Sequence, residues 1–346
     1  MKKAIGVLVI TTLLLVFFTW NTGEHRGKGT SSGDVKTSGG SSITAVEYQR
    51  MLGVGINVDW MAFAKVNHYY FHWRSSGVNI PEYFKEKGFS NVRIRVSEDV
   101  VANRTALLQL GEIVNDTLKA GLIPIITYTA PELRENPTSK SAQEHFVEWW
   151  RTVAEYFRGY PYTLSYDLLI ESSGAIKTHP EILNAVYSQT IQEIRAIDPY
   201  RLVFVTPPYT SSPFYLNDLH VTNDGYTLAE WHIYASGPKK CAYNESYIEN
   251  AISSALNWSR KTGIPTWFGA WRPNCYLKGG GNGNEPLCPM GLELNFTRTM
   301  VSALSKAGIP YDINADVHFF DISNLTWYKS QEKALEIILH PQRTAR

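Results

Sequence analysis

The feature that most constrains this chain is a regular alternation of short apolar runs with amphipathic helical stretches, which begins near Ile43. Such alternation is typical of βαβ units, whose strands lie side by side in a parallel sheet. Eight units of this kind close naturally into a barrel. The predicted strands are Gly53–Trp60, Ser90–Val96, Ile123–Thr129, Leu164–Glu171, Leu202–Thr206, Leu228–Tyr234, Thr266–Ala270 and Ile313–Phe319.

Helices are predicted between and after these strands, and only the one expected near Pro213–Leu219 is poorly marked. An open, doubly wound sheet is the alternative, but the chain lacks the phosphate-loop fingerprint that such nucleotide folds often carry. We therefore predict an α/β protein with a single (β/α)8 TIM-barrel domain over residues 43–346. The clear helices are Pro81–Lys87, Ala106–Ala120, Ala142–Phe157, Pro180–Ile197, Tyr247–Thr262, Leu292–Ala307 and Ser330–Leu339, and glycines suited to end four of them are Gly88, Gly121, Gly263 and Gly308.

The N-terminal residues are predicted to direct export. Two lysines precede an apolar run that ends near residue 20, which is typical of a signal peptide or a short membrane anchor. Residues 21–42 are rich in Gly, Ser and Thr, as expected of a flexible linker. We expect a secreted or cell-surface anchored protein that contacts a membrane only through this anchor. Six glycosylation sequons agree with export: Asn103, Asn115, Asn244, Asn257, Asn295 and Asn324.

Charge and cysteine content narrow the range of partners. The 33 Lys and Arg residues nearly cancel the 32 Asp and Glu residues, so nothing favours nucleic acid, whereas a neutral polysaccharide or oligosaccharide fits. Cys241, Cys275 and Cys288 permit one disulfide in an exported chain, and their spacing does not choose the pairing. That spacing matches no zinc pattern, and we expect neither a metal nor another cofactor. The oligomeric state is left open.

Polar side chains gather where the predicted strands end, which is where (β/α)8 barrels carry their active sites. We expect apolar neighbours to raise the pKa of Glu171 and so make it a proton donor near neutral pH. The alternative is a buried ion network of Arg93, Asp167 and Glu230 without a catalytic role. The residues that share inward faces are Arg93 with Arg95, Asp167 with Glu171, Glu230 with His232 and Tyr234, and Asp316 with His318.

Five short motifs in order along the chain are GVGINVDW, GFSNVRIRV, YDLLIESSG, EWHIY and IPTWFGAW. Together they resemble the retaining glycoside hydrolases of the cellulase family 5, over most of the predicted barrel. The resemblance implies an endo-β-1,4-glucanase-like hydrolase that cleaves O-glycosidic bonds of a β-glucan without a cofactor. It implies that Glu171 is the acid/base, and that Arg93, His232 and Tyr234 support the site.

The same motifs depart from the family's pattern at several strand ends. Ile170 stands in place of the Asn that precedes the acid/base, and Thr129 in place of a His on the third strand. The platform Trp of the eighth strand has no obvious match, although Phe319 or Phe320 could replace it. Most seriously, Ala270 occupies the nucleophile position, and a methyl group cannot attack an anomeric carbon.

Three interpretations of Ala270 stay open. Either Ala270 is an engineered Glu→Ala change, or the protein is a natural, inactive relative that binds glycan at the cell surface, or another carboxylate acts as the second catalytic group. In the last case a separation of about 6.5–9.5 Å from Glu171 would indicate an inverting mechanism. The candidates for that second carboxylate are Glu230, Asp316 and Glu285.

Aromatic side chains are expected to border an open groove across the strand ends, as a polymeric substrate requires. Flat rings stack on sugars, but each of these residues could instead belong to the core. Trp149 and Trp150 lie at helical positions and are expected to pack. The groove candidates are Trp60, Tyr128, Tyr209, Trp231 and Trp271.

Overall fold

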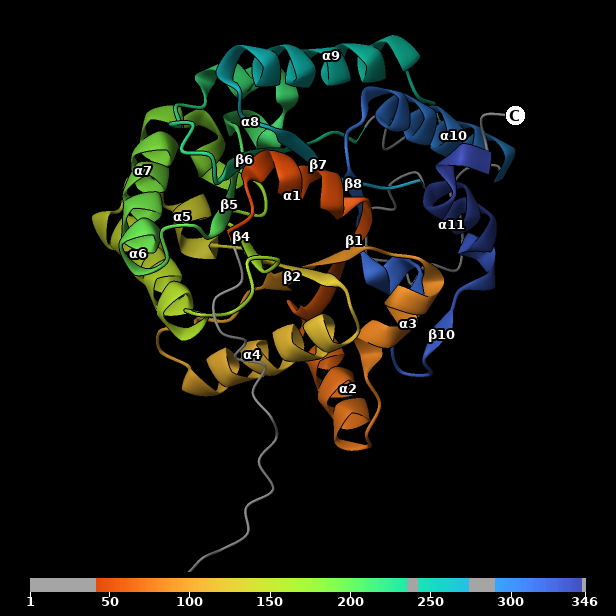
Figure 1. The fold of residues 1–346 in the computed structure, drawn as a ribbon, viewed down its shortest axis with the longest axis horizontal. Coiled ribbons are helices and arrows are strands. Elements are labelled where there is room, and N and C mark those ends of the chain that lie inside the picture. The colour runs from red at the N-terminus through yellow and green to blue at the C-terminus, as the bar shows by residue number, and fades with distance from the viewer. Residues whose placement is uncertain (1–41, 235–241, 274–289, 344–346) are drawn as a thin grey trace, which may run out of the picture. The chain divides into compact units, whose positions relative to one another are not determined.

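The structure is a computed structural model that describes residues 42–234, 242–273 and 290–343. These residues all belong to the compact unit Val35–Arg346. Eight parallel strands close into a barrel in chain order, with β1 paired to both β2 and β8, which confirms the predicted fold (Figure 1). The strands are β1 Val54–Met61, β2 Asn91–Val96, β3 Ile123–Tyr128, β4 Ser165–Asp167, β5 Leu202–Val205, β6 Thr227–His232, β7 Thr266–Trp271 and β8 Tyr311–Ile313.

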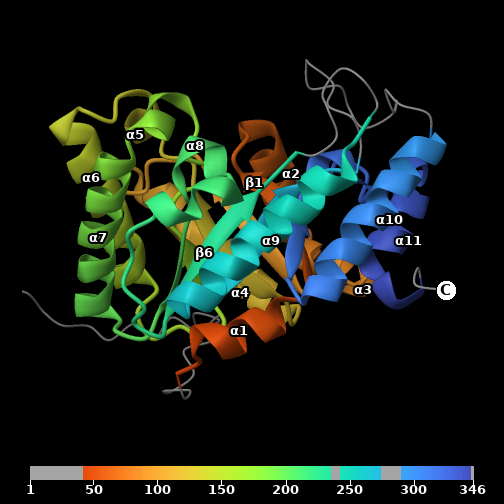
Figure 2. The ribbon, with the colours of Figure 1, turned by 90° about the horizontal axis from the view of Figure 1, so that it is seen from above.

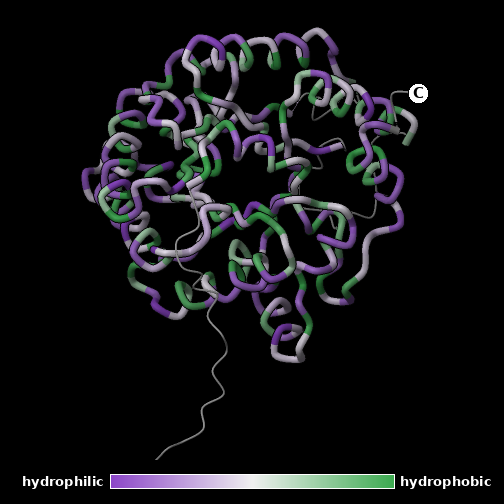
Figure 3. The backbone as a smooth tube through the Cα atoms, in the orientation of Figure 1, coloured by the Kyte–Doolittle hydropathy of each residue, from purple (hydrophilic) through white to green (hydrophobic). Residues whose placement is uncertain are grey.

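Helices surround the barrel, and the seven clearly predicted ones are present with ends within two residues of the prediction. Gly88 and Gly263 adopt the left-handed conformation that ends α3 and α9, as predicted. Figure 3 shows hydrophobic residues along the strands and on helix sides that face them, where the main core lies. The seven helices that match the prediction are α3 Ile80–Lys87, α4 Arg104–Lys119, α6 Lys140–Tyr156, α7 Pro180–Ile197, α9 Glu245–Thr262, α10 Met290–Ala307 and α11 Glu332–Leu339.

The prediction lacks several helices, of which α1 (Ala45–Leu52) and α2 (Ala64–Ser75) are the longest. Thr44 and Glu47 form a capping box that starts α1. Tyr48 of α1 packs with residues of the strands in a second apolar cluster. Figure 2 shows α1 at the end of the barrel opposite α5 (Pro131–Glu135) and α8 (Pro208–Ser211), so α1 covers the N-terminal ends of the strands.

Three predicted elements differ from those observed. Strand β4 ends at Asp167, so Glu171 lies in the segment after the strand rather than on it. Strand β8 ends at Ile313, and residues 316–318 form the 3-10 helix η3 instead of a strand. The buried carboxylate of Asp312 interrupts the apolar run of β8, which hid the strand from pattern recognition. The poorly marked fifth helix is the 3-10 helix η2, Pro213–Asp218.

Among the described residues, none of the helices combines the length and the apolar character that a membrane crossing requires. The N-terminal segment and all three cysteines lie outside those residues. The expected anchor, linker and disulfide therefore stay predictions.

Candidate active site

A cavity of about 380 Å³ opens where the strands end, at the mouth of the barrel. Five of the predicted site residues line it together, although they come from four different strands or the segments after them. Their convergence follows from closure of the sheet, since the carboxyl ends of parallel strands meet at one rim. These residues are Arg93, Glu171, His232, Tyr234 and Ala270.

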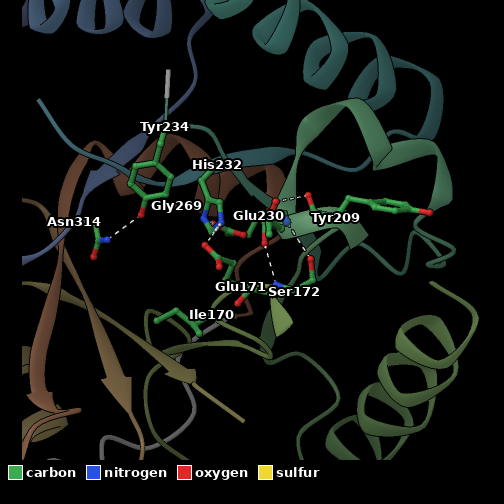
Figure 4. Close-up of polar contacts among 12 residues, drawn as sticks. Ile170, Glu171, Ser172, Tyr209, Glu230, His232, Tyr234, Gly269 and Asn314 are labelled. Carbon is green, nitrogen blue, oxygen red and sulfur yellow. Dashed lines mark hydrogen bonds and ion pairs between the residues drawn. The ribbon is translucent and has the colours of Figure 1, made fainter. Parts of the chain in front are cut away.

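Two carboxylates hold His232 between them. Its Nε2 lies 3.2 Å from Oε2 of Glu171, and its Nδ1 lies 3.1 Å from Oε1 of Glu230 (Figure 4). His232 and Glu230 are almost completely buried, whereas the side chain of Glu171 is 31% exposed to the cavity. The three groups therefore form a row that runs from the barrel interior to its mouth.

The row shifts the pKa values of His232 and Glu171 in opposite directions. Burial lowers the pKa of His232, but the charges and contacts of Glu230 and Glu171 raise that pKa to about 10. Burial likewise raises the pKa of Glu171, but His232, with help from Ser173 and Arg134, brings that pKa down to about 2. The expected rise in the pKa of Glu171 is therefore wrong, because a buried imidazolium outweighs the apolar neighbours.

Arg93 lies beneath the cavity in a buried ion network. Its Nε donates to Oδ2 of Asp167 at 2.7 Å, and its Nη1 lies 3.7 Å from Oε1 of Glu230. Its Nη2 donates to the carbonyl oxygen of Ile170 at 3.1 Å, next to Glu171. Burial raises the pKa of Asp167 to about 6, despite the opposing charge of Arg93. The network contemplated from the sequence therefore exists, and it also supports the backbone that carries Glu171.

Glu230 occupies the space that a side chain at Gly269 would need. A Cβ built on Gly269 would lie only 2.1 Å from Oε1 of Glu230. The carboxylate of Glu230 is completely buried, and Gly269 directly precedes Ala270 in β7. The barrel therefore holds a carboxylate beneath Ala270, although a substrate in the cavity cannot contact it.

The other described candidate for a second carboxylate, Asp316, does not line the cavity either. Asp316 is 2% exposed and accepts a hydrogen bond from the backbone amide of Asp59 at 3.0 Å. Glu285 lies outside the described residues. Among the described residues that line the cavity, Glu171 is the only carboxylate.

Asn314 takes the first position after β8, where sequence reasoning found no candidate. Its Nδ2 donates to the hydroxyl oxygen of Tyr234 at 2.9 Å (Figure 4), and its Oδ1 accepts from Nη1 of Arg95 at 2.8 Å. Phe319 and Phe320 are buried, so neither offers a ring to a sugar. A polar amide therefore stands at this edge of the cavity.

The prediction that aromatic rings border the groove is wrong for four residues, which are buried in the core: Trp60, Tyr128, Trp231 and Trp271. At strand ends these rings point outward against the helices instead of inward, as where Tyr128 stacks on Trp149 with centroids 4.1 Å apart. Trp149 and Trp150 pack in the core, as expected.

The exposed ring at the mouth is one that the sequence analysis missed. Phe63, the residue before α2, is 52% exposed and lines the cavity. Tyr209 is partly buried, but its ring packs against Tyr215 in a tilted arrangement and points away from the pair of Glu171 and His232 (Figure 4). A Phe two residues after the end of β1 was the available signal for this position.

Comparisons with known proteins agree with this geometry. The family model for cellulase, glycosyl hydrolase family 5, matches residues 55–275. An endoglucanase Cel5A from the hyperthermophilic Thermotoga maritima superposes with a TM-score of 0.70 at 20% identity, over 85% of this chain and 100% of the other. A broad-specificity endoglucanase from Clostridium longisporum gives 0.69 at 19% identity, over 87% and 99%.

A third structure, a hyperthermophilic endo-β-1,4-glucanase in complex with substrate, gives a TM-score of 0.69 at 23% identity, over 85% of this chain and 99% of the other. No curated protein matches the sequence. At these identities the solved structures establish the fold, and the family model establishes the relationship. The chain belongs to the cellulase family, glycosyl hydrolase family 5, and is a glycoside hydrolase by descent.

Proposed function

We propose that the barrel mouth binds a β-1,4-linked glucan outside the cell, with Glu171 as the acid/base of an endoglucanase-type site. The observation that carries the proposal is the row of Glu230, His232 and Glu171, which presents one carboxylate to the cavity in a fixed position. An acid/base must reach the glycosidic oxygen, and Glu171 is the carboxylate that the cavity exposes.

Endo action is supported by the surroundings of the cavity at Phe63. A second cavity, of about 390 Å³, lies along α2, and Phe63 lines both. His68 and Phe71 of α2 line the second one. Two neighbouring cavities that share an exposed ring suit a chain of several sugars better than they suit a single chain end.

A second function, glycan binding without hydrolysis, is favoured by Ala270. A retaining mechanism needs two carboxyl groups about 5–5.5 Å apart at the cavity. With Ala270 in place and Glu230 buried, the described residues provide one. The low pKa of Glu171 points the same way, because a carboxylate that is ionised at neutral pH cannot donate a proton to a leaving group.

Hydrolysis and binding of a soluble β-glucan by the full chain, by Ala270→Glu and by Glu171→Gln separate the two functions. If Ala270→Glu gains turnover by at least about 100-fold, while Ala270→Gln gains none, the site is of the retaining type and lacks only its nucleophile. If all variants bind the glucan and none cleaves it, the protein is a glycan-binding relative. Failure of every variant to bind would refute the proposal.

Export is proposed from the N-terminal residues and rests on the basic start and the apolar run up to residue 20. Fractionation of the producing cells, with mass spectrometry of the N-terminus, tests it. Recovery of the intact N-terminus from cytoplasm would contradict export.

A further inference from the structure

The charges that line the mouth cavity are mostly positive. Of the described residues, Arg93, Arg95, Arg134 and His232 line it, against the single carboxylate of Glu171. A cavity for a neutral glucan does not require this excess of cations. These cations differ in whether a carboxylate oxygen contacts them.

Three of the four cations are already neutralised by contact. Arg93 pairs with Asp167, and His232 lies between Glu171 and Glu230. The Nη2 of Arg95 lies 2.5 Å from Oδ1 of Asp59, although its side chain keeps 17% of its surface exposed.

Arg134 differs from the other three. Within the part of the chain that the structure describes, no carboxylate oxygen lies within 4.0 Å of its guanidinium, and its hydrogen bond goes to the neutral hydroxyl of Ser173. Its Nε is buried and makes no hydrogen bond to any described residue. A buried donor without an acceptor costs about 1–3 kcal/mol, so a ligand that supplies an acceptor is favoured.

The position of Arg134 is fixed by the packing of its helix. It lies on α5, next to the 3-10 helix η1 (Gly174–Thr178) that follows Glu171. A Cβ on Gly174 would lie 2.8 Å from the carbonyl oxygen of Arg134, so only glycine permits this approach. This approach fixes the backbone of Arg134, and the hydrogen bond to Ser173 holds its guanidinium near Glu171 before any ligand arrives, which lowers the entropy cost of binding.

Ala270 removes the charge that would oppose an anionic ligand. A carboxylate at this position would repel a second carboxylate in the cavity, whereas a methyl group does not. The guanidinium of arginine also matches a planar carboxylate, to which it can donate two parallel hydrogen bonds.

We infer that the site selects an acidic glycan, in which the carboxylate of a uronic acid unit pairs with Arg134. This inference rests on the proposed glycan site and names the class of sugar that the site takes. Arg95, with its exposed edge, adds to the attraction without replacing Arg134.

Isothermal titration of the full chain with cellotetraose, and with the same tetrasaccharide oxidised to carboxylate at C6, tests the inference. The acidic sugar is expected to bind about tenfold more tightly at low salt, and the ratio of the two affinities should shrink as salt rises. Arg134→Gln should bring that ratio close to one, and Arg134→Lys should restore part of it. Arg260→Gln, on the exposed side of α9, is the matched control and should leave the ratio unchanged.

Two results would overturn the inference in different ways. Equal or tighter binding of cellotetraose by the unaltered chain removes the acidic preference and leaves the β-glucan site intact. Binding of neither sugar removes both the preference and the proposed function. A preference that persists in Arg134→Gln also overturns the inference, because it assigns the anion to another residue.

Discussion

The Nδ1 of His232 lies 3.1 Å from Oε1 of Glu230, a carboxylate that the barrel buries completely. Through this contact a residue that no substrate can reach influences the group that a substrate does reach. Glu230 favours the imidazolium form of His232, and the imidazolium in turn favours the carboxylate form of Glu171.

Glu230→Gln should therefore change two ionisations without altering the cavity lining. Loss of the negative charge is expected to lower the pKa of His232 and raise that of Glu171, each by about one unit or more. NMR titration of the imidazole and of labelled glutamate carboxylates measures both shifts. Glu155→Gln, at an exposed ion pair with Arg151, is the control and should move neither. An unchanged titration of His232 in Glu230→Gln would show that Glu230 only fills space.

His318 should make the protein sensitive to mild acid. Burial, with the charges of Arg272 and Arg95, lowers the pKa of His318 to about 4, whereas the unfolded chain has a value near 6.5. The unfolded state therefore binds more protons between these values, and the free energy of unfolding falls as pH drops from 6.5 to 4. Urea unfolding at pH 7, 5.5 and 4 should show a smaller fall for His318→Gln, while the exposed His220→Gln keeps the full fall. Identical falls in all three proteins would refute the prediction.

Gly269→Ala should destabilise the barrel by about 1–3 kcal/mol, because its new methyl group overlaps the carboxylate of Glu230. Combined with Glu230→Ala, it should cost less than the sum of the two single changes. Urea unfolding of the unaltered chain, the two single variants and the double variant measures the coupling free energy between the two positions. Gly291→Ala is the control, since nothing lies within 4 Å of a Cβ there and the helix α10 should tolerate it. Additive losses would mean that the overlap is relieved elsewhere.

Phe63→Ala should weaken the binding of long oligosaccharides by about tenfold and of disaccharides much less. The side chain is exposed, so folding should be little affected. Titration with cello-oligosaccharides of increasing length provides the measurement, and Phe214→Ala, an exposed ring on η2, is the control. A loss that is independent of length would contradict the use of both cavities by one glycan chain.

The barrel could be predicted from the sequence because its strands and helices follow regular periods. Strand β8 was misplaced because Asp312 breaks the apolar run. Helix α1 precedes the first strand, where the alternating pattern predicts no helix, and α2 buries only Val66 and Tyr70, so its sequence carries little helical periodicity. The convergence of Arg93, Glu171, His232 and Tyr234 was also predictable, since closure of the barrel brings strand ends together.

Side-chain direction at the strand ends could not be predicted. Trp60 packs against Tyr70 and Phe84 outside the barrel, whereas Phe63, three residues later, faces the cavity. The pKa of Glu171 depends on a contact across two strand ends, which the local sequence LLIESS does not contain. Similarly, the role of Arg134 depends on the packing of a short helix against Gly174.

The carboxylate of Glu230 next to Gly269 makes the effect of a change at position 270 depend on the residue at position 230. Ala270→Glu would add a third acidic group near the imidazole of His232, which pairs with position 270 across β6 and β7. The two positions are therefore epistatic, and the same change at position 270 should have a different effect when Gln replaces Glu230.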